Sequence, residues 1–214
     1  MKTKRFLLAV IFGFALAFTF SCSSDDGDKS SGGSDVFSSL PTQVYLEDGK
    51  KFTGSGDIEF VFKNSWELVL PVSVGTIQNG KITLDLPKTI PDKYLTALDD
   101  SFYSFENSTV QGEAKITSEA WLRAIIDGEE CYLGLVGSTG EIWREAEFVY
   151  SSGSGKITGT RYIQYKGSSI YNINLSKGWN LIYSEGKECD ECQGQVSTDS
   201  KIITGELNWE IGCY

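Results

Sequence analysis

Apolar and polar residues alternate with a period of two along most of the chain from Pro41 onward, as is typical of β-strands with one buried face. Clusters of Gly, Asn, Asp and Ser separate these stretches and predict turns. Strands are expected at residues 44–46, 57–62, 68–77, 115–126, 131–135, 141–150, 156–165, 171–175, 179–183 and 201–211. The pattern predicts an all-β protein. We expect one antiparallel β-sandwich domain over residues 40–214, with a division near residues 99–108 as the alternative.

The strongest turn signal is Asn79-Gly80, a pair that favours a two-residue hairpin loop because both residues tolerate positive φ. This loop places Ile77 opposite Ile82 and Gly75 opposite Leu84. The residues between them then form a polar face, so the register is consistent on both sides of the hairpin.

A second hairpin is expected around Asp127-Gly128. A four-residue loop from Asp127 to Glu130 would pair Ile126 with Cys131, and it would continue through Ala124 with Leu133 and Leu122 with Leu135. A two-residue loop would set Ile125 against Glu130, which joins an apolar to a charged residue. The four-residue loop is therefore predicted.

A third hairpin is expected around Ser176-Lys177-Gly178, with Gly178 in the left-handed conformation. This three-residue loop would pair Leu175 with Trp179, Ile173 with Leu181 and Tyr171 with Tyr183. One continuous apolar and aromatic face would result. Three asparagines would point to the opposite side: Asn172, Asn174 and Asn180.

The N-terminus has the layout of a secretory signal peptide over residues 1–21. A basic start, Met1–Arg5, precedes the apolar run Phe6–Phe20, which is shorter than the roughly 20 residues that span a bilayer. Ser21 and Cys22 follow and resemble the lipobox of bacterial lipoproteins, in which the cysteine carries the lipid. The lipobox prefers Leu, Val or Ile where this chain has Thr19, so cleavage without lipidation is the alternative.

Residues 22–39 contain mainly Ser, Gly and Asp and predict a lipidated flexible tether between Cys22 and the domain. The acidic cluster Asp25, Asp26 and Asp28 is similar to export signals of surface lipoproteins in Bacteroidetes-type bacteria, or it serves only as solvated linker charge. The segments TIQNGKITLDLP (76–87) and NINLSKGWNLIY (172–183) also resemble uncharacterised surface lipoproteins of these bacteria. The resemblance implies an exported, lipid-anchored β-protein of the outer membrane, facing the periplasm or the cell exterior. It implies no catalytic residue.

The charge balance argues against a nucleic-acid partner. The chain has 19 basic and 29 acidic residues, and removal of residues 1–21 takes away three basic ones, which leaves a net charge of −13. Phosphate binding requires a surplus of Lys and Arg on one face. The chain contains no histidine, which excludes Ser-His-Asp and Cys-His nucleophile pairs and imidazole metal sites.

Four cysteines remain besides Cys22: Cys131, Cys189, Cys192 and Cys213. In an oxidising compartment they favour disulfides, and the preferred pairing is Cys189–Cys192 with Cys131–Cys213. Zinc binding and redox catalysis are the alternatives for the C-x-x-C motif. Its acidic neighbours would raise the thiol pKa, which disfavours redox catalysis. No metal site and no cofactor is expected.

Two remaining residue types bear on function. Paired carboxylates could cleave glycosides, and strand alternation singles out Glu67, between Trp66 and Leu68, although no partner acid is evident. An exposed tryptophan beside Asn or Asp could stack on a sugar, whereas core filling is the ordinary role. The candidates are Trp66, Trp121, Trp143, Trp179 and Trp209.

We therefore expect a non-catalytic binding or structural domain whose ligand is a glycan or a protein, with no catalytic residue assigned. A carboxylate-dependent enzyme acting on polysaccharide is the alternative. A deep cleft with two facing acids would favour the enzyme, and an exposed aromatic patch would favour the binding module.

Overall fold

The computed structural model describes residue 37 and residues 39–213, apart from 65–66, 69–70, 102, 118–119, 164–166, 188, 190–191 and 204. Cys22, the signal peptide, most of the tether and Trp66 lie outside the described residues. All described residues fall in one unit, Ser31–Tyr214. Helical structure is confined to short segments, including the 3-10 turns η1 (Asp92–Tyr94), η2 (Leu98–Asp100) and η3 (Ser200–Ile202).

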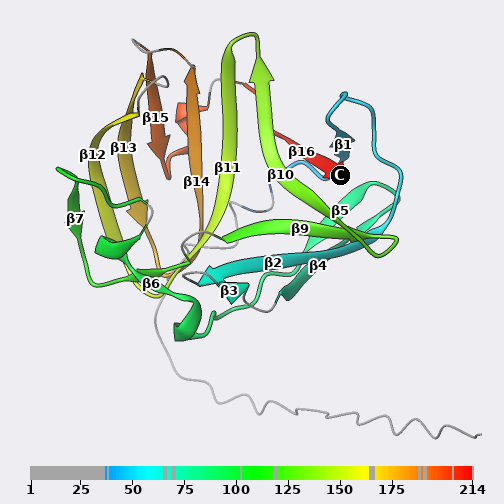
Figure 1. The fold of residues 1–214 in the computed structure, drawn as a ribbon, viewed down its shortest axis with the longest axis horizontal. Coiled ribbons are helices and arrows are strands. Elements are labelled where there is room, and N and C mark those ends of the chain that lie inside the picture. The colour runs from blue at the N-terminus through cyan, green and yellow to red at the C-terminus, as the bar shows by residue number, and fades with distance from the viewer. Residues whose placement is uncertain are drawn as a thin grey trace, which may run out of the picture. The chain divides into compact units, whose positions relative to one another are not determined.

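Strands account for most of the described chain, which confirms the predicted all-β class (Figure 1). They are β1 (Val44–Leu46), β2 (Gly56–Asn64), β3 (Glu67–Leu68), β4 (Val72–Gln78), β5 (Lys81–Leu84), β6 (Thr96–Ala97), β7 (Thr109–Gln111), β8 (Lys115–Ile116), β9 (Ala120–Ile126), β10 (Glu129–Thr139), β11 (Ile142–Ser151), β12 (Gly155–Ile163), β13 (Gly167–Leu175), β14 (Gly178–Lys187), β15 (Gln193–Ser197) and β16 (Asn208–Cys213).

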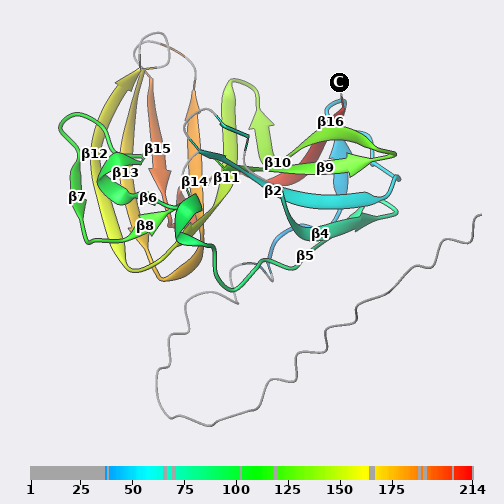
Figure 2. The ribbon, with the colours of Figure 1, turned by 60° about the horizontal axis from the view of Figure 1, so that its bottom comes forward.

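The strands form one open mixed sheet in the order β5-β4-β2-β9-β10-β11-β14-β15-β13-β12-β7. The expectation of a purely antiparallel arrangement is wrong, because β1 pairs with β16 and β13 pairs with β15 in parallel. The two-sheet sandwich is not confirmed. Strands β5, β4, β2 and β9 form a first strand group, and β11, β14, β15, β13, β12 and β7 form a second. Figure 2 shows β10 between the two groups.

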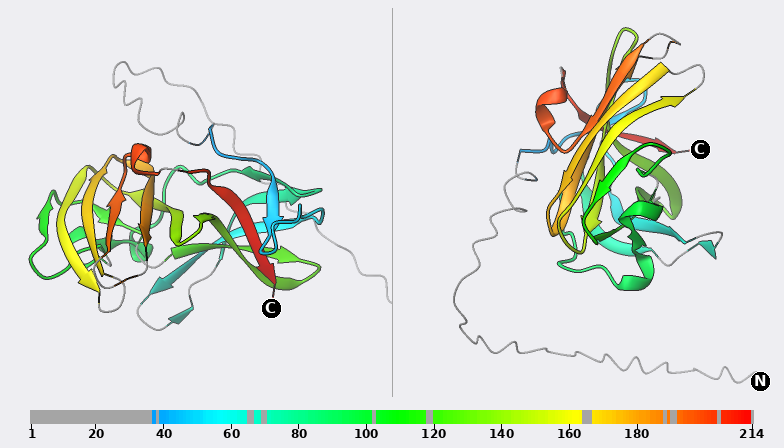
Figure 3. Two further views of the ribbon diagram at one scale, coloured as in Figure 1. Left: turned by 90° about the horizontal axis from the view of Figure 1, so that it is seen from above. Right: turned by 90° about the vertical axis from the view of Figure 1, so that its left-hand side faces the viewer.

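Two apolar clusters lie on opposite faces of the central strands β11 and β14. Phe148 of β11 and Leu181 of β14 belong to the larger cluster, which the first strand group encloses. Val149 and Ile182, their chain neighbours, belong to the smaller cluster. The segment from β6 to β8 covers that second face, as Figure 3 shows, and contributes Leu98, Tyr103 and Ile116 to the smaller cluster. Burial of both faces explains why β14 carries three consecutive buried apolar residues, Leu181, Ile182 and Tyr183.

The Asn79-Gly80 hairpin has the predicted register, with Ile77 opposite Ile82 and Gly75 opposite Leu84. Asn79 and Gly80 adopt φ values of 51° and 73°, as a type I′ turn requires. The long strand expected over 68–77 is divided, however. β4 begins at Val72, directly after Pro71, which cannot donate a ladder hydrogen bond.

The predicted four-residue loop at Asp127-Gly128 is wrong. The structure has a two-residue loop that pairs Ile126 with Glu129 and Ile125 with Glu130. Asp127 and Gly128 have φ values of 52° and 87°, so the turn chemistry decides the register. The shift is two residues, and the predicted apolar face is therefore preserved, with Leu122, Ala124, Cys131, Leu133 and Leu135 buried.

The predicted strand pairing of the third hairpin is also wrong. Gly178 has the expected positive φ, 101°, but β13 and β14 do not pair with each other. β15 lies between them, parallel to β13 and antiparallel to β14. Leu175 therefore faces the smaller cluster, whereas Trp179 faces the larger one. A short loop fixes how two strands connect, but it does not prevent a third strand from entering between them.

Both cysteine pairs expected from the sequence are present. Cys131 and Cys213 occupy directly opposite positions of β10 and β16, with a Cα–Cα distance of 4.3 Å. Cys189 and Cys192 close a short loop before β15. The thiols are thereby engaged as disulfides in the described structure.

Candidate functional site

The sheet divides at β10, and this division creates a cleft in the described structure. β10 pairs with β9 through residues Glu129–Leu133 and with β11 from Leu135 onward. The opposite edge of β10 pairs with β16 over both stretches. β9 and β11 therefore share one edge of β10 and separate at Gly134. We call this position the fork, and the opening beside it the fork cleft.

The fork cleft has a volume of about 150 Å³. A dry cavity of about this size binds a molecule such as benzene. Its floor consists of side chains of the larger core cluster, namely Phe60, Leu122, Leu133, Leu135, Phe148 and Trp209. These floor residues are at most 5% exposed, so the cleft ends on buried side chains of the core.

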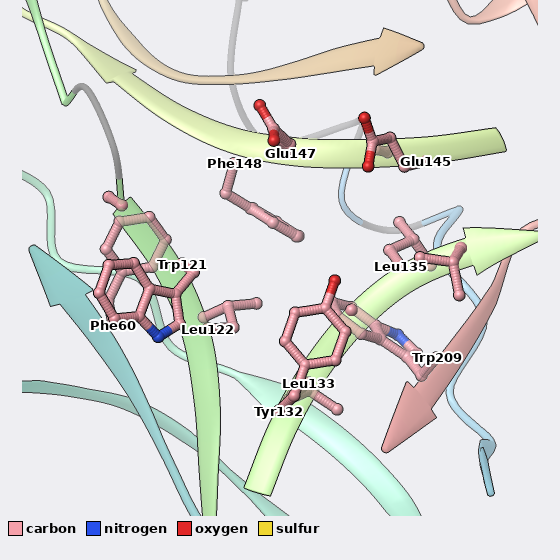
Figure 4. Close-up of a pocket in the computed structure, with 14 residues that line it drawn as sticks. Phe60, Trp121, Leu122, Tyr132, Leu133, Leu135, Glu145, Glu147, Phe148 and Trp209 are labelled. Atoms are coloured by element: carbon pink, nitrogen blue, oxygen red, sulfur yellow. The ribbon is translucent and has the colours of Figure 1, made fainter. Parts of the chain in front are cut away.

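Two aromatic side chains form one side of the mouth, as Figure 4 shows. Trp121 of β9 is 39% exposed and Tyr132 of β10 is 46% exposed, both unusual for large apolar groups. Tyr132 lies across Gly134, where a Cβ atom would stand 2.8 Å from its ring. The glycine therefore allows the tyrosine ring to lie close to the backbone at the fork.

Two carboxylates form the other side of the mouth. Glu145 and Glu147 occupy alternate positions of β11, so both point to the face opposite Ala146 and Phe148. Val136 pairs with Glu145, and the side chains of Tyr132 and Val136 lie on the same face of β10, on either side of Gly134. The aromatic groups and the acids therefore lie on the same surface of the sheet, on either side of the fork.

Glu147 is held by a residue far away in the sequence. The buried hydroxyl of Tyr103 donates a hydrogen bond to the Glu147 carboxylate. Burial raises the pKa of Tyr103 well above its ordinary value, and the negative charges of Glu147 and Glu145 raise this pKa further. Tyr103 is consequently a neutral donor at physiological pH, and the Glu147 carboxyl group has further lone pairs that can accept hydrogen bonds.

The surroundings of the fork cleft are acidic. No Lys or Arg is among the described residues that line it. Arg123 pairs with Tyr132 across the strands, but its guanidinium lies between Glu59, at 2.8 Å, and Glu130, at 2.5 Å. Arg144, although next to Glu145 in sequence, is buried and bound to Glu185 at 2.6 Å. The site therefore combines exposed aromatic surface with net negative charge.

The tryptophans named from the sequence have separate roles. Trp179 and Trp209 are buried, and their indole N–H groups donate to the carbonyl oxygens of Pro87 and Pro41 at 2.8 and 2.7 Å. Trp143 packs over Gly186, its partner on β14. Among the tryptophans that the structure describes, Trp121 is the exposed one that lines a cleft.

Glu67, the candidate acid from the sequence, does not belong to the strands that form the fork. Its backbone lies in β3, paired with Asn64, while its side chain lies outside the described part of the chain. Sequence reasoning missed Tyr132, Glu145, Glu147 and Tyr103. The alternation Glu145-Ala146-Glu147 did place two acids on one strand face, but the fork that gives them a cleft has no local sequence signature.

The asparagine row does not remain together. Asn172 and Asn174 are exposed on one face of β13, and the amide of Asn174 donates to that of Asn172 at 3.3 Å. Asn180 instead binds the loop before β14, through Ser176 and the carbonyl of Gly178. The exposed face around Asn172 also carries Tyr162, which is 65% exposed and is not among the residues that line the fork cleft.

Within the described ranges no cluster of three or more His, Cys, Asp or Glu side chains is arranged to hold a metal ion. No helix in the described part of the chain is both long and apolar enough to cross a membrane.

Comparison with protein-family models, with curated proteins and with solved structures finds no significant match.

Proposed function

We propose that this chain is a lipid-anchored cell-envelope protein whose β-domain binds a glycan without cleaving it, and that the fork cleft is the binding site. The observation that carries the proposal is the exposed pair Trp121 and Tyr132 beside an apolar cleft, opposite Glu145 and Glu147. Sugar rings present apolar faces that stack on aromatic side chains, and their hydroxyl groups donate hydrogen bonds to carboxylates. The cleft offers both kinds of contact within one small area.

The arrangement of the two acids favours binding over hydrolysis. Glycosidases place their two carboxyl groups on either side of the scissile bond. Glu145 and Glu147 instead extend from one strand toward the same side, with Cα atoms about 6.6 Å apart at the usual rise of a strand. A substrate bond at the mouth would meet both acids from one direction. The enzyme is therefore the less favoured alternative.

The proposed test is a calorimetric titration of the full-length protein with neutral oligosaccharides. Trp121→Ala should weaken binding at least about tenfold, which corresponds to about 1.4 kcal/mol. Tyr162→Ala is the matched control, since it removes an equally exposed aromatic group away from the cleft. Equal losses in both variants, or release of shorter sugars that stops in Glu147→Gln, would contradict a non-catalytic site at the fork.

The anchor has its own test, because the proposed envelope location depends on Cys22. Cys22→Ser should abolish palmitate labelling and transfer the protein from the outer membrane to the soluble fraction. A variant that still sediments with the outer membrane would show that the lipid is not the anchor.

A further inference from the structure

The charge of the fork cleft points to a narrower ligand class than glycans in general. We propose that the fork cleft selects a sugar unit that carries a protonated amine, that is, an amino sugar without its N-acetyl group. This inference rests on the proposed function, since it assumes that the cleft binds a glycan, and it specifies which group of the glycan is recognised.

The first argument is the sign of the charges at the mouth. Glu145 and Glu147 lie on one wall, and no basic residue is among the described residues that line the cleft. Arg123, which lies opposite Tyr132 on the neighbouring strand, is compensated by Glu59 and Glu130. Acidic sugars would therefore be repelled, neutral sugars would gain only hydrogen bonds, and a cation would be attracted.

The second argument is that the aromatic side of the mouth also attracts cations. The face of an indole or phenol ring carries negative electrostatic potential and binds ammonium groups, Trp most strongly. Trp121 and Tyr132 are both partly exposed beside the acids. An ammonium group between the rings and the carboxylates would contact favourable charge on two sides. An acetylated amine has no charge and would lose both contacts.

The third argument is that the recognising carboxylate is held in position before the ligand arrives. Tyr103 belongs to the smaller core cluster and donates a hydrogen bond to Glu147. The Glu147 side chain therefore does not have to be ordered when the ligand binds. A carboxylate has about four lone-pair sites. After accepting from Tyr103, Glu147 can still accept from an ammonium group, which has three donors.

The size of the cleft limits how much of the ligand enters. About 150 Å³ accommodates a group of the size of one ring, so one sugar unit fills the cleft and its neighbours lie over the outer face. A terminal or single amino-sugar unit is sufficient for recognition.

The test compares three trimers of the same linkage in the full-length protein: glucosamine, N-acetylglucosamine and glucose. At low ionic strength the glucosamine trimer should bind at least about tenfold more tightly than either neutral trimer. The difference should shrink in high salt and at a pH where the amine is neutral. Glu147→Gln should remove most of the difference in affinity between the glucosamine trimer and the two neutral trimers. Tyr162→Ala should change none of the three affinities.

Each other outcome overturns the inference in a distinguishable way. Equal affinities for the three trimers would exclude amine selection and leave glycan binding intact. Absence of binding to all three would contradict the proposed function as well. A difference that persists in both Glu147→Gln and Glu145→Gln would place the amine elsewhere. Nα-acetyl-lysine amide keeps a charged ε-ammonium group but has no sugar ring. If it binds as tightly as the glucosamine trimer, the cleft recognises a cationic side chain and not a sugar.

Discussion

The hydroxyl of Tyr103 donates a hydrogen bond to the carboxylate of Glu147 across 44 positions of sequence. Tyr103 belongs to the segment that covers the second face of β11 and β14, and it packs in the smaller core cluster. Glu147 lies at the mouth of the fork cleft. The contact therefore links the covering segment to the proposed binding site.

Tyr103→Phe should separate the positioning role of this contact from its structural role. The variant loses one hydrogen bond, and because Glu147 is exposed, water can replace the donor. The free energy of unfolding should fall by about 1 kcal/mol in urea titrations. Glycan affinity should also fall, since the carboxylate must then be ordered on binding. Loss of stability with unchanged affinity would show that Tyr103 has no positioning role.

Alkaline pH should destabilise the protein in part through the same residue. The folded pKa of Tyr103 lies well above the ordinary value of 10.0, mainly because the phenol is buried. Above pH of about 10 the unfolded chain loses this proton while the folded chain retains it, so unfolding becomes more favourable as pH rises. The stabilisation is complete below that pH and is lost progressively above it.

This effect can be measured as the urea midpoint at pH values of about 9 and about 11. Tyr103→Phe should reduce the fall in the urea midpoint between these two pH values. It should not remove the loss, because burial also raises the pKa of Tyr183. An identical loss in the wild type and in Tyr103→Phe would contradict the assignment.

Gly134→Ala should affect the cleft more than the fold. The added Cβ would lie 2.8 Å from the Tyr132 ring, so the ring has to move from its position at the mouth of the cleft. Ligand affinity should therefore fall while the free energy of unfolding changes by less than about 1 kcal/mol.

Gly128→Ala is the matched control for Gly134→Ala, because it should show the opposite pattern. Gly128 has a φ of 87° and no atom within 4 Å of an added Cβ, so only backbone strain results. Stability should fall by about 1 kcal/mol or more, with ligand affinity unchanged. Equal affinity losses in the two variants would contradict a role for the Tyr132 ring.

Arg144→Met should strongly destabilise the fold, because it removes a buried charged side chain from its partners. The guanidinium is 4% exposed, binds Glu185 at 2.6 Å and donates to Thr139 at 3.1 Å. Removal of one partner leaves a buried charge, which costs about 3 kcal/mol or more. Lys187→Met, which breaks the exposed pair with Glu141, should cost less than about 1 kcal/mol. Urea titration of both variants measures the difference, and equal costs would contradict the burial argument.

Local sequence patterns determined several features correctly. The period of two predicted the all-β class, and Asn79-Gly80 predicted both its turn and its register because φ preferences act within a few residues. The preferred pairing of the four cysteines is also present. At Asp127-Gly128 the same turn rule was available, but a preference for apolar pairing was given more weight, and the register was misassigned by two residues.

The tertiary structure alone decided which strands meet. The entry of β15 between β13 and β14 separates Leu175 from Trp179, although only two residues connect their strands. Likewise, only the division of β10 between β9 and β11 brings Trp121 and Tyr132 beside Glu145 and Glu147. Strand pairing between distant segments depends on how two apolar clusters are buried together. No local preference specifies that arrangement, and so the strands were predictable from the sequence while the fork cleft was not.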